Sequence, residues 1–144
     1  LNTWLVESKG LSGLEAQNRY ESANNDISSY EITRKQQYDL FVITYNRLEA
    51  DVKRICQKPA TIRACHPNQN ITPEQAWNDI PEKIKEVLVD LRYRGDYTSH
   101  ARSLIQRYAY IGDLSAFGQI LSNRAQWSNV PQDRFLRRVR FYEN

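Results

Sequence analysis

The pattern that most constrains the fold of this chain is a run of apolar residues at helical spacing behind a helix-start signal. In residues 32–56, ITRKQQYDLFVITYNRLEADVKRIC, Thr33 is followed three residues later by Gln36, which is the spacing of a capping box. The apolar residues that follow return to one face of a helix: Leu40, Ile43, Leu48, Val52 and Ile55. We therefore expect one long helix here, capped by Thr33.

Further start and stop signals divide the rest of the chain into shorter helices. Thr72 with Gln75 repeats the capping box, and Asp113 is placed to cap a later helix. Gly95 and Gly112 each follow a run with helical apolar spacing and predict its end. Only 5 glycines and 5 prolines occur, with little alternation of apolar and polar residues, which disfavours a β-rich fold. We expect an all-α, compact orthogonal helical bundle.

Length and charge limit the number of domains and the classes of partner. With 144 residues the chain suits one core, and we assign residues 32–144 to one helical domain. Residues 1–31 are expected to form an irregular lead-in and a short connecting helix. No apolar stretch approaches the roughly 20 residues that span a bilayer, so membrane insertion is not expected. The net charge of +3 is mild and the tyrosines fit a core, so nucleic acid is not an expected partner.

The two cysteines lie close together in the sequence. Cys56 and Cys65 enclose QKPATIRA, and we expect a disulfide between them that closes this segment as a short loop, which implies an oxidising compartment. Two unrelated buried thiols are the alternative. A zinc site would need two further ligands and only His66 lies nearby, so no metal is expected.

The usual enzyme motifs are missing from the sequence. It has no phosphate-binding Gly-rich loop, no His-Glu-x-x-His and no Gly-x-Ser-x-Gly, and we expect no cofactor. Carboxylates are plentiful enough for a two-carboxylate glycosidase, but their spacing does not select a pair.

The basic C-terminal segment allows three interpretations. In NRAQWSNVPQDRFLRRVRFYEN, a tryptophan precedes four arginines that lie within seven positions. The segment could bind nucleic acid, form a solvated basic helix, or line a sugar-binding cleft. We expect Arg137, Arg138 and Arg140 on a solvated face.

From about residue 32 onward the chain resembles the helical C-terminal lobe of the T-even phage lysozymes and the pesticin-like muramidases. The resemblance rests on four motifs in the family's order: ITRKQQYDLFVITYNRLEADVKRI, EKIKEVLVDLRYRG, SLIQRYAYIGDLSAF and RAQWSNVPQDRFLRR. It implies that Trp127 packs under the cleft between two lobes. It also implies that Arg134 pairs with the catalytic Glu, that Tyr93 and Arg94 face the cleft, and that Asn129 bonds the glycan or caps the last helix.

The N-terminal part departs from that family. Its members carry a catalytic Glu on a first helix, then an Asp and a Thr on a Gly-rich β-hairpin, and no such hairpin follows Glu7 here. Glu7 is therefore only a weak candidate for the catalytic carboxylate. The first residue is Leu, and the chain lacks both Met and a secretory signal, so we expect the catalytic lobe upstream of it.

The resemblance implies a glycoside hydrolase, of which this chain is the substrate-holding lobe. The expected reaction is cleavage of the MurNAc-GlcNAc β-1,4 bond of peptidoglycan by an endolysin, a bacteriocin or an antibacterial effector. The expected partners are the glycan strand, the upstream catalytic lobe and an immunity protein that blocks the cleft. The expected location is secreted or periplasmic. The alternative is a noncatalytic helical module that binds peptidoglycan or a partner protein.

Overall fold

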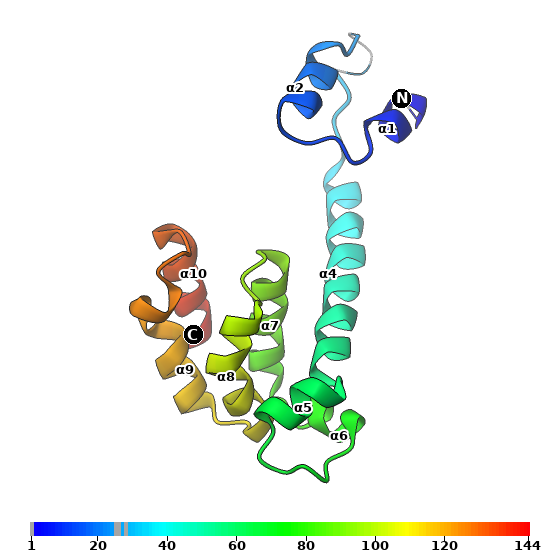
Figure 1. The fold of residues 1–144 in the computed structure, drawn as a ribbon. Helices are drawn as coiled ribbons and strands as arrows, with labels where there is room; N and C mark the ends of the chain where they lie inside the picture. Colours follow the sequence, from blue (N-terminus) through cyan, green and yellow to red (C-terminus); the bar gives the residue numbers. More distant parts are fainter. Residues whose placement is uncertain (1, 25–26, 28) are drawn as a thin grey trace. The chain divides into compact units, whose positions relative to one another are not determined.

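The computed structural model describes residues 2–24, 27 and 29–144 (Figure 1). All regular secondary structure in this described part is helical, without any strand, which confirms the all-α prediction. The chain divides into two units, which we call unit 1 (Leu1–Phe41) and unit 2 (Val42–Asn144). Over the same residues, no helix combines the length and the apolar character that a bilayer crossing requires.

Unit 1 holds α1 (Asn2–Ser8), α2 (Gly13–Glu21) and the first turns of α4 (Arg34–Cys56). The prediction of an irregular lead-in was wrong for α1, where Ser8 Oγ donates a hydrogen bond to the Trp4 carbonyl at 2.6 Å. Arg19 of α2 stacks over the Trp4 ring at 5.2 Å. None of the residues described in this unit is fully buried, so unit 1 has little core of its own.

Helix α4 begins where the capping box predicts. Gln36 N donates to Thr33 Oγ1 at 3.2 Å, and Thr33 N donates to Gln36 Oε1 at 2.8 Å. The predicted apolar stripe is buried only in its second half, because Val52 is fully buried whereas Leu40 and Ile43 are 54% and 65% exposed. The helical spacing of the stripe is therefore as predicted, and only its second half packs into the core.

Two short helices follow α4. The segment between the cysteines, which sequence analysis treated as a loop, is α5 (Pro59–Cys65), with proline at its first position. Helix α6 (Pro73–Asn78) has the predicted capping box, in which the Thr72 side chain accepts from Gln75 N and the Gln75 side chain accepts in return from Thr72 N.

The remaining helices of unit 2 enclose its core. They are α7 (Glu82–Tyr93), α8 (Ser99–Ile111), α9 (Leu114–Ser122), the 3₁₀ turn η1 (Arg124–Trp127) and α10 (Gln132–Glu143). Helix α8 packs on α5 and α9, and α10 packs on α7 and α9 (Figure 1). The caps by Asp113 and Gly112 are as predicted. The core includes fully buried side chains from α4, α7, α8 and α9: Val52, Ile84, Val87, Leu88, Leu91, Ile105, Phe117 and Leu121.

A buried polar network replaces the predicted disulfide. Cys56 and Cys65 are both free thiols, and Cys56 Sγ lies 3.5 Å from Tyr97 Oη and 3.3 Å from Gln106 Nε2. Tyr97 also hydrogen-bonds Gln106, and Tyr110 Oη donates to the Cys56 carbonyl at 2.6 Å. The bond that we expected is not formed, because Cys56 is packed inside this network and Cys65 stands at the end of a separate helix. Burial raises the pKa of both thiols.

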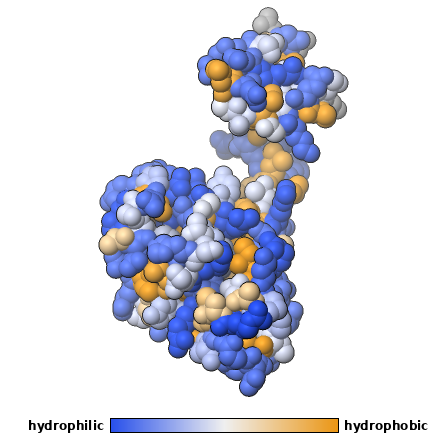
Figure 2. Space-filling model, viewed as in Figure 1, coloured by the Kyte–Doolittle hydropathy of each residue, from blue (hydrophilic) through white to orange (hydrophobic). Residues whose placement is uncertain are grey.

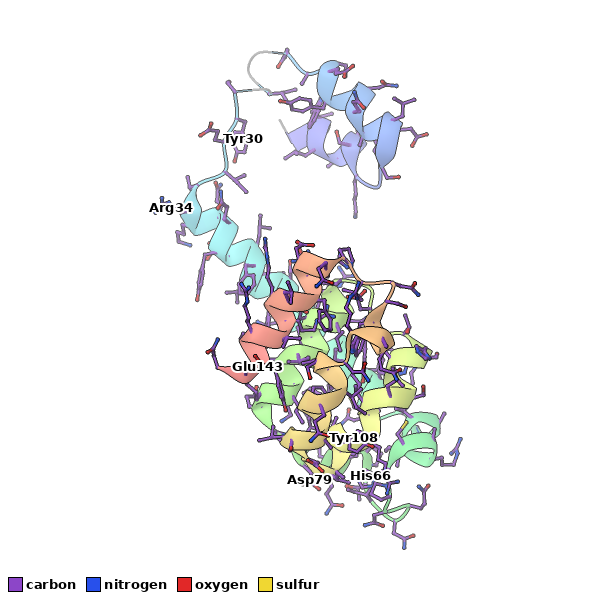
Figure 3. The ribbon with its side chains drawn as sticks, turned by 90° about the vertical axis from the view of Figure 1, so that its left-hand side faces the viewer. Tyr30, Arg34, His66, Asp79, Tyr108 and Glu143 are labelled. Atoms are coloured by element: carbon purple, nitrogen blue, oxygen red, sulfur yellow. The ribbon has the colours of Figure 1, made fainter. Side chains whose placement is uncertain are left out.

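His66, which follows Cys65, is buried and serves the local structure. Its Nδ1 accepts a hydrogen bond from Asn68 N at 3.0 Å, and its ring packs against Tyr110 with 4.9 Å between centroids. Figure 3 labels it at the same end of unit 2 as Asp79 and Tyr108.

Candidate functional site

A cluster of opposite charges joins the end of α7 to α10. Arg138 Nε donates to Asp90 Oδ2 at 2.7 Å, and Arg138 Nη2 donates to Asp96 Oδ2 at 2.8 Å. Arg134 Nη1 lies 3.7 Å from the other oxygen of Asp96. We call these four residues, with Arg94, the charged cluster. Because its arginines outnumber its aspartates, the charged cluster carries one excess positive charge.

The turn after α7 brings Asp96 to this place. Gly95 has a φ of 78°, a conformation that glycine adopts without a steric penalty. The amides of Asp96 and Tyr97 then both donate to the Leu91 carbonyl, at 2.8 and 3.1 Å, which closes the end of the helix. The predicted stop at Gly95 therefore also positions a carboxylate.

Trp127 lies beneath the charged cluster. It is 5% exposed, and its Nε1 donates to the Ile120 carbonyl at 3.0 Å, so it is anchored at both its ring and its polar atom. Its ring centroid is 6.0 Å from Arg138 Cζ. The geometry places the tryptophan as a floor under the buried guanidinium.

Arg124, which sequence analysis did not select, holds the segment after Trp127. Its guanidinium donates to the carbonyls of Trp127 and, at 2.8 Å, of Val130, and it stacks over the Phe135 ring at 5.2 Å. No local sequence signal distinguishes it from the other arginines, because its partners are backbone oxygens. Asn129 projects from this segment, exposed, and its side chain makes no hydrogen bond with any described residue.

The remaining predicted site residues lie at the rim of the charged cluster. Tyr93 is 60% exposed, and the Arg94 guanidinium lies 5.1 Å from the centre of its ring. Arg94 Nε is 4.0 Å from Asp90 Oδ1. The structure thus brings Arg94 and Arg134 to one pair of carboxylates, with Tyr93 beside Arg94 and Trp127 under the Arg138 that joins the two carboxylates.

Arg138 corrects the prediction of a solvated helix face. Arg137 and Arg140 are exposed as predicted, but Arg138 is only 5% exposed. A buried guanidinium is stable only when paired, and its partners Asp90 and Asp96 come from more than 40 residues upstream. Local periodicity could not reveal them. One donor, Arg138 Nη1, is buried and has no hydrogen-bond partner among the described residues.

Glu7, the weak catalytic candidate, lies in unit 1 in a surface ion pair. Its side chain is 58% exposed and Oε2 is 2.5 Å from Arg19 Nη2. The Arg19 guanidinium also donates to Ser8 Oγ at 3.3 Å. This arrangement is that of an exposed ion pair that connects α1 to α2.

Most of the face of unit 2 seen in Figure 2 is hydrophilic, and apolar side chains appear there in small separate patches. The fold and site define an all-α protein with a cluster of arginines and aspartates around one buried guanidinium. A family model described as "Domain of unknown function (DUF8812)" matches residues 1–139, so the chain belongs to this family. Neither the curated proteins nor the solved structures contain a match.

Proposed function

We propose that this chain is the substrate-holding helical lobe of a muramidase, a glycoside hydrolase that cuts the MurNAc-GlcNAc β-1,4 bond of peptidoglycan. One observation carries the proposal. The lysozyme resemblance assigns roles to Arg94, Arg134 and Trp127, and all three adjoin the charged cluster: Arg94 and Arg134 contact its two carboxylates, and Trp127 lies under the Arg138 that joins them. They meet there although 30 or more residues separate Arg94 from the other two.

The chemistry of this end of unit 2 suits a neutral, hydroxyl-rich ligand. Tyr93 offers an exposed ring on which a sugar can stack, and Asn129 offers an amide that can both donate and accept. The paired charges present donors on Arg94 and acceptors on Asp90, both of which a sugar hydroxyl can satisfy. Trp127, being buried, shapes the floor and does not touch the ligand.

In this proposal the catalytic Glu belongs to a lobe outside this chain, and Arg134 is the cation that pairs with it. Arg134 is suited to that role because its contact with Asp96 is long, at 3.7 Å, which leaves most of its donors available. The proposed setting is an antibacterial effector, bacteriocin or endolysin that meets peptidoglycan outside the cytoplasm. An immunity protein that blocks this end of unit 2 would protect the producing cell.

The alternative is a helical module that binds peptidoglycan or a partner protein without cutting it. The state of Glu7 favours this alternative, because its carboxylate is exposed and already paired with Arg19. Under this alternative, Tyr93 and Asn129 would still bind a ligand. A longer polypeptide that contains this chain would then not release reducing sugar ends.

The test is release of reducing-end muramic acid from purified peptidoglycan by this chain and by a longer polypeptide that contains it. We expect activity in the longer form only, and a loss of at least tenfold in its Arg134→Gln variant. Arg137→Gln, which changes an exposed arginine one turn away, is the matched control and should keep full activity. Activity in the isolated chain would assign catalysis to it, and silence from both forms would favour the binding module.

A further inference from the structure

A second charged site lies on unit 2, in a groove between α4 and α7. The groove has a volume of about 670 Å³ and is lined mainly by α4, with Arg92 contributed by α7. This size falls within the roughly 300–1,000 Å³ typical of small-ligand sites. Helix α7 runs beside this part of α4 (Figure 1), and Arg92 Nε donates to Asp51 Oδ2 at 2.5 Å across the two helices.

The groove is strongly cationic. Arg47, Arg54 and Arg92 line it, and Asp51 is the only carboxylate among its lining residues. Asp51 hydrogen-bonds Arg54 at 2.5 Å and Arg92 at 2.5 Å, and the hydrogen bond from Arg54 lowers the pKa of its carboxyl. Among the lining residues, three cations and one carboxylate leave a net charge of two positive units.

The arginines of the groove also use only some of their N–H donors in hydrogen bonds with described residues. A guanidinium has five N–H donors, and Arg92 bonds Asp51 through Nε alone, so its terminal amino groups have no acceptor among the described residues. Arg47 is exposed and contacts none of the described carboxylates. Asp51 is therefore a positioning residue. It fixes the guanidiniums of Arg54 and Arg92 at the groove wall, and their remaining N–H donors are available to a ligand.

The spacing of the cations suits an extended ligand. Arg47 and Arg54 are seven residues apart on α4, which is two turns and about 10 Å along one helix face. Ile43 and Leu48 line the groove beside them, and they give it apolar walls that a bare phosphate would not use. A short peptide with small apolar side chains and two or more carboxylates matches both features.

We propose that this groove binds an acidic peptide, and that its ligand is the carboxylate-bearing stem peptide attached to MurNAc. The choice of this peptide rests on the proposed function, because the stem peptide accompanies every glycan strand that a muramidase holds. The groove therefore recognises the peptide, and the charged cluster with Tyr93 recognises the sugar.

The test uses the 144-residue chain and isothermal titration calorimetry with a synthetic stem tetrapeptide, L-Ala-γ-D-Glu-diaminopimelate-D-Ala. We expect binding that weakens with salt, and that weakens about tenfold in Arg47→Gln and in Arg92→Gln. Arg137→Gln is the control and should bind as wild type does. Arg47 makes no contact that holds the fold, so loss of binding in that variant cannot be attributed to unfolding.

Three results would overturn the proposal: no binding at millimolar tetrapeptide, equal binding in Arg47→Gln, or equal binding of a peptide whose carboxylates are all amidated. A separate titration with a peptide-free chitooligosaccharide distinguishes this failure from failure of the proposed function. Sugar binding that depends on Tyr93, without peptide binding, would refute only the groove. Peptide binding without sugar binding would support the groove and count against the glycan site.

Discussion

Replacing Asp96 by Asn tests whether the buried Arg138 guanidinium is held by its two carboxylates. The substitution keeps the size of the side chain and removes the charge that accepts from Arg138 Nη2 at 2.8 Å. Because the Arg138 side chain is 3% exposed, the guanidinium cannot regain water, and it would keep only Asp90 as a charged partner. Breaking a buried pair in this way costs about 3–5 kcal/mol, and the remaining Asp90 places the expected cost near the lower value.

A second substitution distinguishes the cost of leaving the Arg138 charge buried without a partner from the cost of losing the attraction between Arg138 and its carboxylates. Arg138→Met removes the buried charge itself, and it leaves Asp90, whose side chain is 42% exposed, free to be hydrated. We therefore expect Arg138→Met to cost less than Asp96→Asn, by about 1 kcal/mol or more. The control is Asp39→Asn, since Asp39 pairs with Lys35 on the surface and should contribute less than about 1 kcal/mol.

The assay is urea unfolding followed by circular dichroism at 222 nm, with thermal melting in parallel. A loss of about 3 kcal/mol should lower the melting temperature by roughly 10 °C for a protein of this size. If Asp96→Asn unfolds within about 1 kcal/mol of wild type, or if Arg138→Met is the more damaging change, the buried guanidinium does not depend on Asp96 as argued.

Three further predictions concern other parts of the chain. A Cβ at Gly118 would lie 2.7 Å from Tyr142 Cε1, so Gly118→Ala should displace that ring and cost about 1–3 kcal/mol in urea unfolding; an unchanged midpoint would mean that Tyr142 moves freely. The pKa of Asp51 is lowered from 3.8, chiefly by its hydrogen bond with Arg54. Its contribution to stability is therefore present above about pH 4 and lost as pH falls below that value, and Asp51→Asn should flatten this part of a stability-pH curve. Burial raises the pKa of the Cys56 thiol, so in a Cys65→Ser variant, which removes the other free thiol, Cys56 should react with Ellman's reagent only on unfolding. Fast labelling of the folded variant would contradict the place of Cys56 in the network.

Local signals predicted the helices well because the residues that carry them bond to their own neighbours. The hydrogen bonds of the capping boxes at Thr33 and Thr72 join residues only three positions apart, so a short sequence motif is enough to predict them. Helix α5 was missed because the cysteines suggested a disulfide loop, although Pro59 is a common first residue of a helix.

The parts of the site that sequence analysis missed depend on partners that are distant in sequence. In the sequence, Arg138 cannot be distinguished from the neighbouring surface arginines, because its partners Asp90 and Asp96 are distant along the chain. Arg54 and Arg92 likewise meet only at Asp51. The basic C-terminal segment therefore drew attention to the arginines of α10, but its sequence did not show which of them is buried.

The network around Cys56 has a consequence for how unit 2 opens. Cys56 ends α4, whereas Tyr97 precedes α8 and Gln106 and Tyr110 belong to it. Separating these helices would break several buried hydrogen bonds at once, because Cys56, Tyr97, Gln106 and Tyr110 all take part in one network. The two helices should therefore open as one cooperative unit in hydrogen exchange, with the amides around Gln106 protected up to the free energy of global unfolding.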